Sequence, residues 1–274
     1  MKKFFKGLFQ IRGSVSQPWS VVLGLIPLAW IVFIWWFVTK GAIVEERMIS
    51  PVILPSPLEV VQQIPLLLTK GKLIEGAVAS FVRVGIGFLL AIAVALPLGI
   101  AMGSFSRVKA MFQPIAVMGG YLPIAALVPL TLVWFGTSEK QKYMFLAIAF
   151  FVYVLPLIVK AMDKVDDVFV QSAYTLGAGR WQIATKVLIP IAFYDIWQAL
   201  RLAFGIGWSY IILAEVILSD AGLGQIITVA QRRGPREYIY LVILVIALLA
   251  FSTDKIMGWV GNKLFPYRKN EEYG

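Results

Sequence analysis

The chain has 274 residues, of which 59% are hydrophobic and 15% are charged, and it contains no cysteine and no histidine. This composition predicts an integral membrane protein without disulfides, thiol nucleophiles, imidazole bases or the usual zinc and haem ligands, so we expect no catalytic, metal or cofactor site. We assign the net charge of +10 to basic residues that flank membrane spans in lipid, and we expect no nucleic acid partner.

The N-terminal segment mixes basic and apolar residues ahead of the first long apolar run. Phe4 and Leu8 share one face of a helix, which favours a short helix lying along the cytoplasmic membrane surface. The run at 21–38 is long for a signal peptide core, and no small-x-small cleavage site follows it. We therefore predict an interfacial segment at residues 1–19 and a transmembrane domain at residues 20–274.

Apolar runs of membrane-spanning length recur along the rest of the chain. The run at 115–135 is the most irregular, because Pro114, Pro123 and Pro129 interrupt it. Together the runs predict an all-α integral membrane protein with about six transmembrane helices, at residues 21–38, 77–102, 115–135, 143–159, 191–218 and 239–260.

The connections between these runs indicate an orientation, and small residues within them indicate close helix contacts. Lys and Arg are more frequent in the connections that lie inside when both termini are cytoplasmic, which favours that topology in a bacterial-type plasma (inner) membrane. The pairs Gly99 with Gly103 and Ala203 with Gly207 have small-x-x-x-small spacing, which predicts tight packing against neighbouring helices.

The segment at 163–190 is too polar to cross the bilayer. Its apolar stripe fits one helix face, and Asp166 and Asp167 suit the first turn of that helix because negative charge favours a helix N-terminus. Gly177 and Gly179 can both take the left-handed conformation that ends a helix, and Pro190 suits the start of the next helix. We predict an amphipathic hairpin on the cytoplasmic face.

This segment resembles the signature loop of membrane (permease) subunits of ATP-binding cassette (ABC) importers. That family has Glu-Ala-Ala, three residues, glycine, nine residues and then Ile-x-Leu-Pro. Here Gln171, Ser172 and Ala173 occupy the Glu-Ala-Ala places, Gly177 is the glycine, and "VLIP" ends at Pro190. The spacing is intact, while Gln171 and Ser172 depart from the pattern, and the missing carboxylate weakens the case for a polar contact at Gln171.

Other stretches resemble the subclass that imports nitrate, sulfonates, taurine or bicarbonate. They are "LPSPLEVV", "SFVRVGIGF", "PLTLVWFG" and "LRLAFGIGWSYIILAEV". The resemblance implies a type I importer permease fold in which residues 20–274 form the permease domain and two such subunits, in a homodimer, form the pore. It also implies a soluble extracytoplasmic binding protein and separate cytoplasmic ABC ATPase subunits that hold ATP and Mg.

Within that family the hairpin presents a coupling helix to the ATPase. The resemblance therefore implies docking residues in the hairpin, to which we add Trp181 because its large ring needs an apolar neighbour, either on the ATPase or on the chain's own helix ends. These residues are Gln171, Ser172, Ala173, Gly177, Gly179, Trp181 and Pro190. The chain has no G-x-x-x-x-G-K-[ST] phosphate loop, so we expect no ATPase activity of its own.

Three ionisable residues lie inside predicted spans, where charge is costly. Arg83 and Arg201 suit a path for anions, with Glu215 holding one of them; structural ion pairing, or an Arg83 side chain that reaches the outer interface, is the alternative. Asp195, Asp254 and Lys255 are explained by solvated positions near helix ends. A stand-alone channel, an ion-coupled secondary transporter, and a membrane-anchored structural or enzyme-complex subunit remain rival functions.

Overall fold

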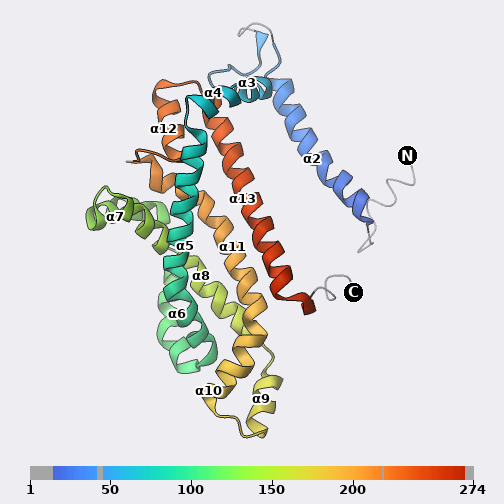
Figure 1. Ribbon diagram of the computed structural model, residues 1–274, viewed down its shortest axis with the longest axis vertical. Coiled ribbons are helices and arrows are strands. Elements are labelled where there is room, and N and C mark those ends of the chain that lie inside the picture. The colour runs from blue at the N-terminus through green and yellow to red at the C-terminus, as the bar shows by residue number, and fades with distance from the viewer. Residues whose placement is uncertain (1–14, 42–45, 218, 269–274) are drawn as a thin grey trace. The chain divides into compact units, whose positions relative to one another are not determined.

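The computed structural model describes residues 15–41, 46–217 and 219–268, and every regular element within them is helical (Figure 1). The chain divides into two compact units, Met1–Ile64 and Pro65–Gly274. Residues 1–14, and with them most of the predicted interfacial segment 1–19, lie outside the described residues, so that segment and its boundary with residues 20–274 stay a prediction.

The described part of the first unit contains one long apolar helix and one short capped helix. Helix α2 (Gln17–Val38) has no Asp, Glu, Lys or Arg, which is the composition expected of a helix in lipid. Helix α3 (Pro57–Gln62) begins at a capping box, in which Ser56 Oγ accepts from Glu59 N and Ser56 N donates to Glu59 Oε2. Both terminal nitrogens of Arg47 donate hydrogen bonds to the same Glu59 carboxylate, at 3.1 and 2.8 Å.

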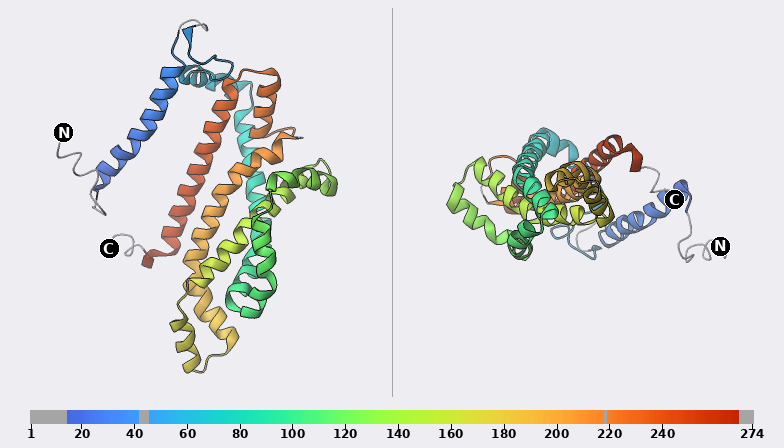
Figure 2. Two further views of the ribbon diagram at one scale, coloured as in Figure 1. Left: turned by 180° about the vertical axis from the view of Figure 1, so that it is seen from behind. Right: turned by 90° about the horizontal axis from the view of Figure 1, so that it is seen from below.

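The second unit is built around three long helices that lie side by side in both views. They are α5 (Leu73–Ser104), α8 (Glu139–Asp163) and α11 (Ile189–Val216) (Figures 1 and 2). Helix α13 (Glu237–Leu264) packs beside α11, and α12 (Leu223–Arg233) contacts α5, α11 and α13. Two short pieces, α4 (Ile64–Thr69) and the 3₁₀ turn η4 (Pro266–Arg268), complete it.

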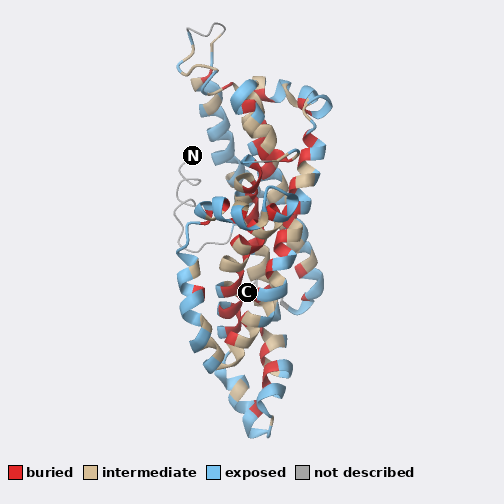
Figure 3. Cartoon of the chain, turned by 90° about the vertical axis from the view of Figure 1, so that its left-hand side faces the viewer, coloured by how far each residue is buried: buried red, intermediate tan, exposed pale blue. Residues whose placement is uncertain are grey.

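Small residues allow these helices to approach closely, as predicted. A Cβ added at Gly99 would lie 2.7 Å from Ile158 Cγ2, and one at Gly103 would meet Met162, so α5 and α8 contact each other at the glycine backbone. On α11, Ala203 is fully buried and Gly207 lies directly under the Phe150 ring of α8. The buried residues of this unit gather along these contacts (Figure 3).

The predicted span 115–135 is not one straight helix. Helix α6 (Ser106–Gly120) is followed by the 3₁₀ turn η2 (Ile124–Ala126) and by α7 (Leu127–Phe135), and the two arms meet at 86° (Figure 2). The reason is Pro123, which lacks an N–H, clashes with a continuing helix and adopts an extended conformation at the bend. The described residues therefore contain five helices able to span a membrane, or six if the bent pair counts as one.

The polar segment between α8 and α11 forms α9 (Asp167–Thr175) and α10 (Arg180–Ile183). A π-helical turn, η3 (Ala184–Leu188), then joins α10 to α11 without a break, and α11 begins at Ile189 with Pro190 in its first turn, as predicted. Proline cannot bond the carbonyl four residues earlier and its ring clashes there. The wider π turn immediately before Pro190 accommodates this and keeps the helix continuous.

Candidate functional site

Residues 163–190, which we call the loop unit, form the end of the second unit at which α9 and α10 lie (Figure 1). The N-cap of α9 is Asp166, whose carboxylate accepts from Val168 N at 2.9 Å, and Asp167 occupies the first turn. Both aspartates lie at the helix start, which confirms the sequence prediction. In this position they satisfy exposed backbone amides and complement the helix dipole.

The two glycines of the loop unit have different roles. Gly177 has a φ of +77°, and the hydrogen bonds from Gly177 N to Tyr174 O and from Ala178 N to Ala173 O close the end of α9. Gly179 has a φ of −76°, so the prediction of a left-handed conformation there is wrong. It is instead the N-cap of α10, and its N–H donates to Gln182 Oε1 at 2.8 Å.

The apolar stripe of the loop unit is only partly buried. Ala173 is buried, but Phe169 is exposed and Leu176 is 87% exposed. The Trp181 side chain is 73% exposed, although its ring lies edge-on to Phe105 with 5.1 Å between ring centroids. Packing against the chain's own helix ends therefore uses only part of Trp181, and a large apolar surface is left on a segment too polar for lipid.

The signature positions Gln171 and Ser172 are both exposed on α9. The Ser172 hydroxyl is already used within the helix, since it donates to Val168 O at 2.7 Å. Pro190 is also exposed, at the junction of η3 and α11. The structure thus presents most of the predicted docking residues to the surface, while their function as docking residues stays a prediction.

A buried charge cluster lies at the other candidate site, where α5, α8 and α11 meet the start of α12. Arg83 and Glu215, which are 4% and 1% exposed, form an ion pair with 2.7 Å between Nη1 and Oε1. Glu139 accepts from Arg83 Nε and Nη2, each at 2.7 Å, and Lys142 Nζ donates to the same carboxylate at 2.6 Å. Two positive and two negative charges therefore balance within the cluster.

The same cluster fixes the loop between α11 and α12. Arg83 Nη1 also donates to Ala221 O at 2.6 Å, and Gly224 N donates to Glu215 Oε2 at 2.8 Å. Ser80 Oγ donates to Glu215 and accepts from Leu223 N at 2.9 Å. Gly222, with a φ of +132°, lies so close to the Glu215 carboxyl group that an added Cβ would be 2.5 Å from it.

These contacts change the interpretation of the predicted substrate path. All three guanidinium nitrogens of Arg83 donate to groups of the chain itself, so an anion would have to displace a carboxylate to bind there. Arg201 lies elsewhere, bonded to Asp254 of α13 at 2.6 Å through Nε and 2.7 Å through Nη2. Asp254 is therefore an ion-pair partner and not merely a solvated residue. The geometry favours structural ion pairing, and a path role for Arg83, Arg201 and Glu215 stays a prediction.

Sequence reasoning missed Glu139, Lys142 and Ser80. Glu139 and Lys142 fall at a span boundary, where charged residues are ordinarily solvated, so neither the burial of Lys142 nor the pairing of Glu139 with Arg83 carries a local signal. Ser80 lies three residues before Arg83 and therefore on the same helix face, which is the one sign that the arginine has a polar neighbour.

Solved structures share this arrangement of helices. An inward-facing structure of the MetNI methionine ABC transporter matches with a TM-score of 0.61 and 16% sequence identity, covering 75% of this chain and 97% of that chain. At this identity the likeness is one of fold. The class that this fold defines is that of helical membrane proteins built like the solved transporter.

The family follows from the sequence comparison. Residues 95–266 match the binding-protein-dependent transport system inner membrane component, and the chain belongs to this family. This confirms the predicted family and fold class.

The chain is also similar in sequence to three permeases whose names include a substrate. The taurine transport system permease protein TauC of Escherichia coli is 29% identical over 90% of each chain. The putative aliphatic sulfonates transport permease protein SsuC of Bacillus subtilis is 28% identical over 91% of this chain and 88% of its own. The nitrate import permease protein NrtB of Synechococcus elongatus is 25% identical over 68% of each chain. The predicted subclass is thus the one to which these relatives belong.

Proposed function

We propose that this chain is the translocating subunit of an ATP-driven importer and that its loop unit receives the work of ATP hydrolysis from separate cytoplasmic ATPase subunits. The observation that carries the proposal is the exposure of Phe169, Leu176 and Trp181 on a segment that is too polar for the bilayer. Aromatic and aliphatic side chains of this kind act as anchors when a partner covers them. ATP and Mg would be bound by the partner, since the chain lacks a phosphate loop.

The remaining partners follow from the family. The family description supports a binding protein outside the cell that would deliver the substrate. We propose in addition that a second copy of this chain completes the pore. The bias of Lys and Arg among the connections supports a plasma (inner) membrane topology with both termini cytoplasmic.

The substrate class is supported by the relatives' names. Taurine, aliphatic sulfonates and nitrate each carry a small group with several equivalent oxygens that share negative charge, and the relatives named for them cover most of this chain. We therefore propose a small substrate with an oxyanion group, and bicarbonate stays within this class.

Affinity purification of the tagged chain from its own membranes tests the ATPase partnership. We expect a protein with a G-x-x-x-x-G-K-[ST] phosphate loop to copurify in stoichiometric amount, and its amount to fall when Trp181 is replaced by Asp. If the chain is purified without an ATPase and an ion gradient drives its transport of substrate, the result would support the secondary transporter instead.

A further inference from the structure

A polar pocket of about 340 Å³ adjoins the buried charge cluster and shares Glu215 with it. Its walls come from the turn before α8, from the end of α11 with the loop that follows it, and from one face of α12. They are formed by Thr137, Glu215, Val216, Ile217, Ser219, Asp220, Gln225, Thr228, Val229 and Arg232.

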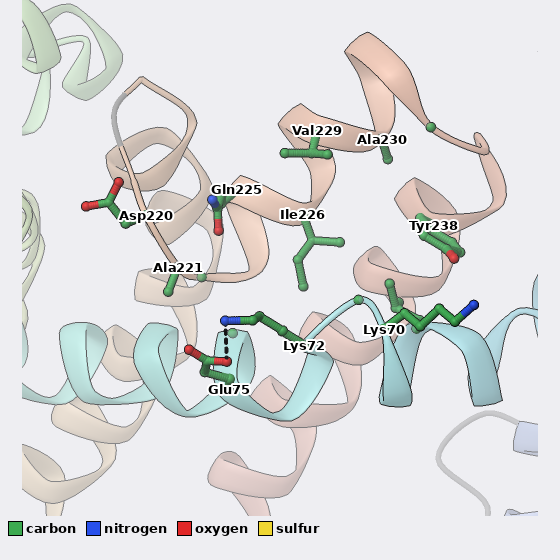
Figure 4. A pocket seen from close by; sticks show the side chains of 15 residues that line it. Lys70, Lys72, Glu75, Asp220, Ala221, Gln225, Ile226, Val229, Ala230 and Tyr238 are labelled. Carbon is green, nitrogen blue, oxygen red and sulfur yellow. Dashed lines mark ion pairs between the residues drawn. The ribbon is translucent and has the colours of Figure 1, made fainter.

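The α12 wall is polar because of the helix period. Gln225, Thr228 and Arg232 lie at i, i+3 and i+7 and therefore share one face. A neighbouring pocket of about 230 Å³ shares Asp220, Gln225 and Val229 with this one and is lined in addition by α12 side chains such as Ile226 and Ala230 (Figure 4). The two pockets therefore adjoin each other along α12.

Two opposite charges on the wall of the polar pocket lack a partner in the described part of the chain. Arg232 and Asp220 are both exposed, and neither forms an ion pair or a side-chain hydrogen bond with another described residue. Lys72, the cation nearest to Asp220 in Figure 4, pairs with Glu75 at 3.2 Å, and the Asp220 carboxylate points away from that pair. Glu215, by contrast, is neutralised by Arg83.

The neighbouring polar groups suit the two charges. Ser219 and Thr228 also line the pocket, and because their hydroxyls donate to Ala221 O and Gly224 O, their oxygens keep lone pairs that can accept from a cationic group. Gln225, on the same face of α12 as Arg232, adds an amide N–H₂ to the lining, and N–H donors of this kind bind oxyanions. A simple anion would be attracted by Arg232 but repelled by Asp220.

We propose that this pocket is an outer receiving site for a small zwitterion, with Arg232 binding its anionic group and Asp220 its ammonium group. The inference rests on the proposed importer function and deepens it by naming the charge pattern of the substrate. Among the oxyanions considered above, an aminosulfonate such as taurine has both groups, whereas nitrate and alkanesulfonates have only the anionic one.

The test compares uptake of labelled taurine and labelled ethanesulfonate, which lacks the ammonium group, in cells that produce the complete transporter with its native partners. Each variant replaces the chromosomal copy, and its amount in the membrane is measured by immunoblot. We expect Arg232→Gln to lower the maximal uptake rate of both probes about tenfold, because a charge-assisted hydrogen bond is lost. The external concentration at half-maximal uptake should not change, since the binding protein captures the substrate.

Asp220→Asn separates the zwitterion from the anion. We expect it to lower maximal taurine uptake about tenfold while ethanesulfonate uptake stays the same or rises. The matched control is Arg233→Gln, which removes the same charge from the adjacent residue of α12 outside the pocket lining and should change either rate by less than about twofold.

Two kinds of result would overturn the inference. Equal effects of Arg232→Gln and Arg233→Gln, or equal effects of Asp220→Asn on both probes, would exclude the receiving site while leaving the importer function intact. Wild-type cells that take up neither probe would overturn this inference, while uptake of nitrate or bicarbonate by the same cells would leave the proposed substrate class intact. If Arg232→Gln lowers the amount of protein in the membrane, Arg232→Lys replaces it in the test because it keeps the positive charge. The inference then requires that Arg232→Lys take up both probes faster than Asp220→Asn takes up taurine.

Discussion

Arg83 connects three parts of the second unit through one side chain. It bonds Glu139 at the start of α8, Glu215 at the end of α11 and the carbonyl of Ala221 in the following loop. A buried arginine is tolerated here because two carboxylates and a backbone carbonyl replace its water. The cluster fixes α5, the start of α8 and the end of α11 relative to each other.

Replacing Arg83 by Met should lower the free energy of unfolding by about 3–5 kcal/mol, because the Glu215 carboxylate is then buried without its cation. The double variant Arg83→Met, Glu215→Gln should be more stable than this single variant by about 1–3 kcal/mol, since Glu139 keeps Lys142 as a partner. Denaturant unfolding of the purified chain in micelles measures both.

The control for this experiment is Lys109→Met, which breaks an exposed pair with Asp163. Its loss should be below about 1 kcal/mol, as for other surface ion pairs. Equal losses for Arg83→Met and Lys109→Met would show that the buried cluster contributes no more than a surface pair.

The Arg47–Glu59 pair predicts a pH dependence for the first unit. Hydrogen bonds from Arg47 lower the pKa of Glu59 to about 2. Partial burial opposes this shift in pKa, and the hydrogen bond from the Ser56 amide adds to it. Because the folded pKa is below the unfolded value, the pair contributes stability above about pH 4.5, and this contribution is lost as the pH falls through about 2.

Carbon-13 NMR of glutamate-labelled protein follows this titration directly. We expect the Glu59 midpoint near 2 in the wild type and a shift toward 4.5 in Arg47→Met. Lys72→Met, which breaks the exposed pair with Glu75, should leave the Glu59 midpoint unchanged. A wild-type midpoint near 4.5 would mean that the pair does not form.

At the scale of elements, the loop unit combines a rigid frame with an exposed surface. Asp166 caps α9, Gly177 turns the chain, and η3 joins α10 to α11 in one continuous helix. A force applied to α10 is therefore transmitted along α11, because a continuous helix is stiffer than a hinged connection. This geometry suits a coupling element.

Gly177→Val should disturb that element without unfolding the membrane domain. A β-branched residue at a φ of +77° costs about 1–2 kcal/mol and should displace α10 from α9. We expect normal membrane levels but weaker ATPase copurification and loss of substrate-stimulated ATP hydrolysis, and the same for Trp181→Asp. The control is Gly120→Ala in α6, outside the loop unit, which should retain both because no atom lies within 4 Å of the added Cβ.

The result that would contradict this coupling role is normal transport by both Gly177→Val and Trp181→Asp. Disappearance of both variants from the membrane would instead show that the loop unit stabilises the bundle, and the Phe105 contact of Trp181 would then be its main function.

At the scale of the whole molecule, the predicted topology places the loop unit on the opposite side of the membrane from α12. The chain has no native cysteine, so single cysteines report on each side alone. Arg233→Cys should react with an impermeant maleimide in intact cells, whereas Leu176→Cys should react only after the membrane is permeabilised. Labelling of Leu176→Cys from outside would invert the topology.

Sequence patterns predicted the helices better than the interactions between them. Hydrophobic runs marked the long spans, and the small residues at Gly99 and Gly207 marked their contacts, because both depend on local composition. The sequence did not predict the bend at Pro123 or the π turn before Pro190. A proline indicates that a helix is disturbed, but it does not indicate which conformation results.

Long-range pairing explains the other difference between sequence and structure. The cost of charge in a membrane predicted that Glu215 holds Arg83 or Arg201, but it did not predict Glu139 and Lys142, which join Arg83 from a position typical of a solvated helix end. The polar pocket beside α12 has the same origin, because its residues come from three segments that only the fold brings together.

The central claim is that this chain moves substrate only when separate subunits hydrolyse ATP. The most direct measurement is uptake of labelled taurine, ethanesulfonate and nitrate into liposomes that contain either the complete complex, purified through this chain, or the chain alone, with the binding protein outside and ATP and Mg inside. We predict uptake of at least one substrate by the complete complex with ATP, and none without ATP or by the chain alone. Uptake by the chain alone, or uptake by the complex that does not depend on ATP, would contradict the account.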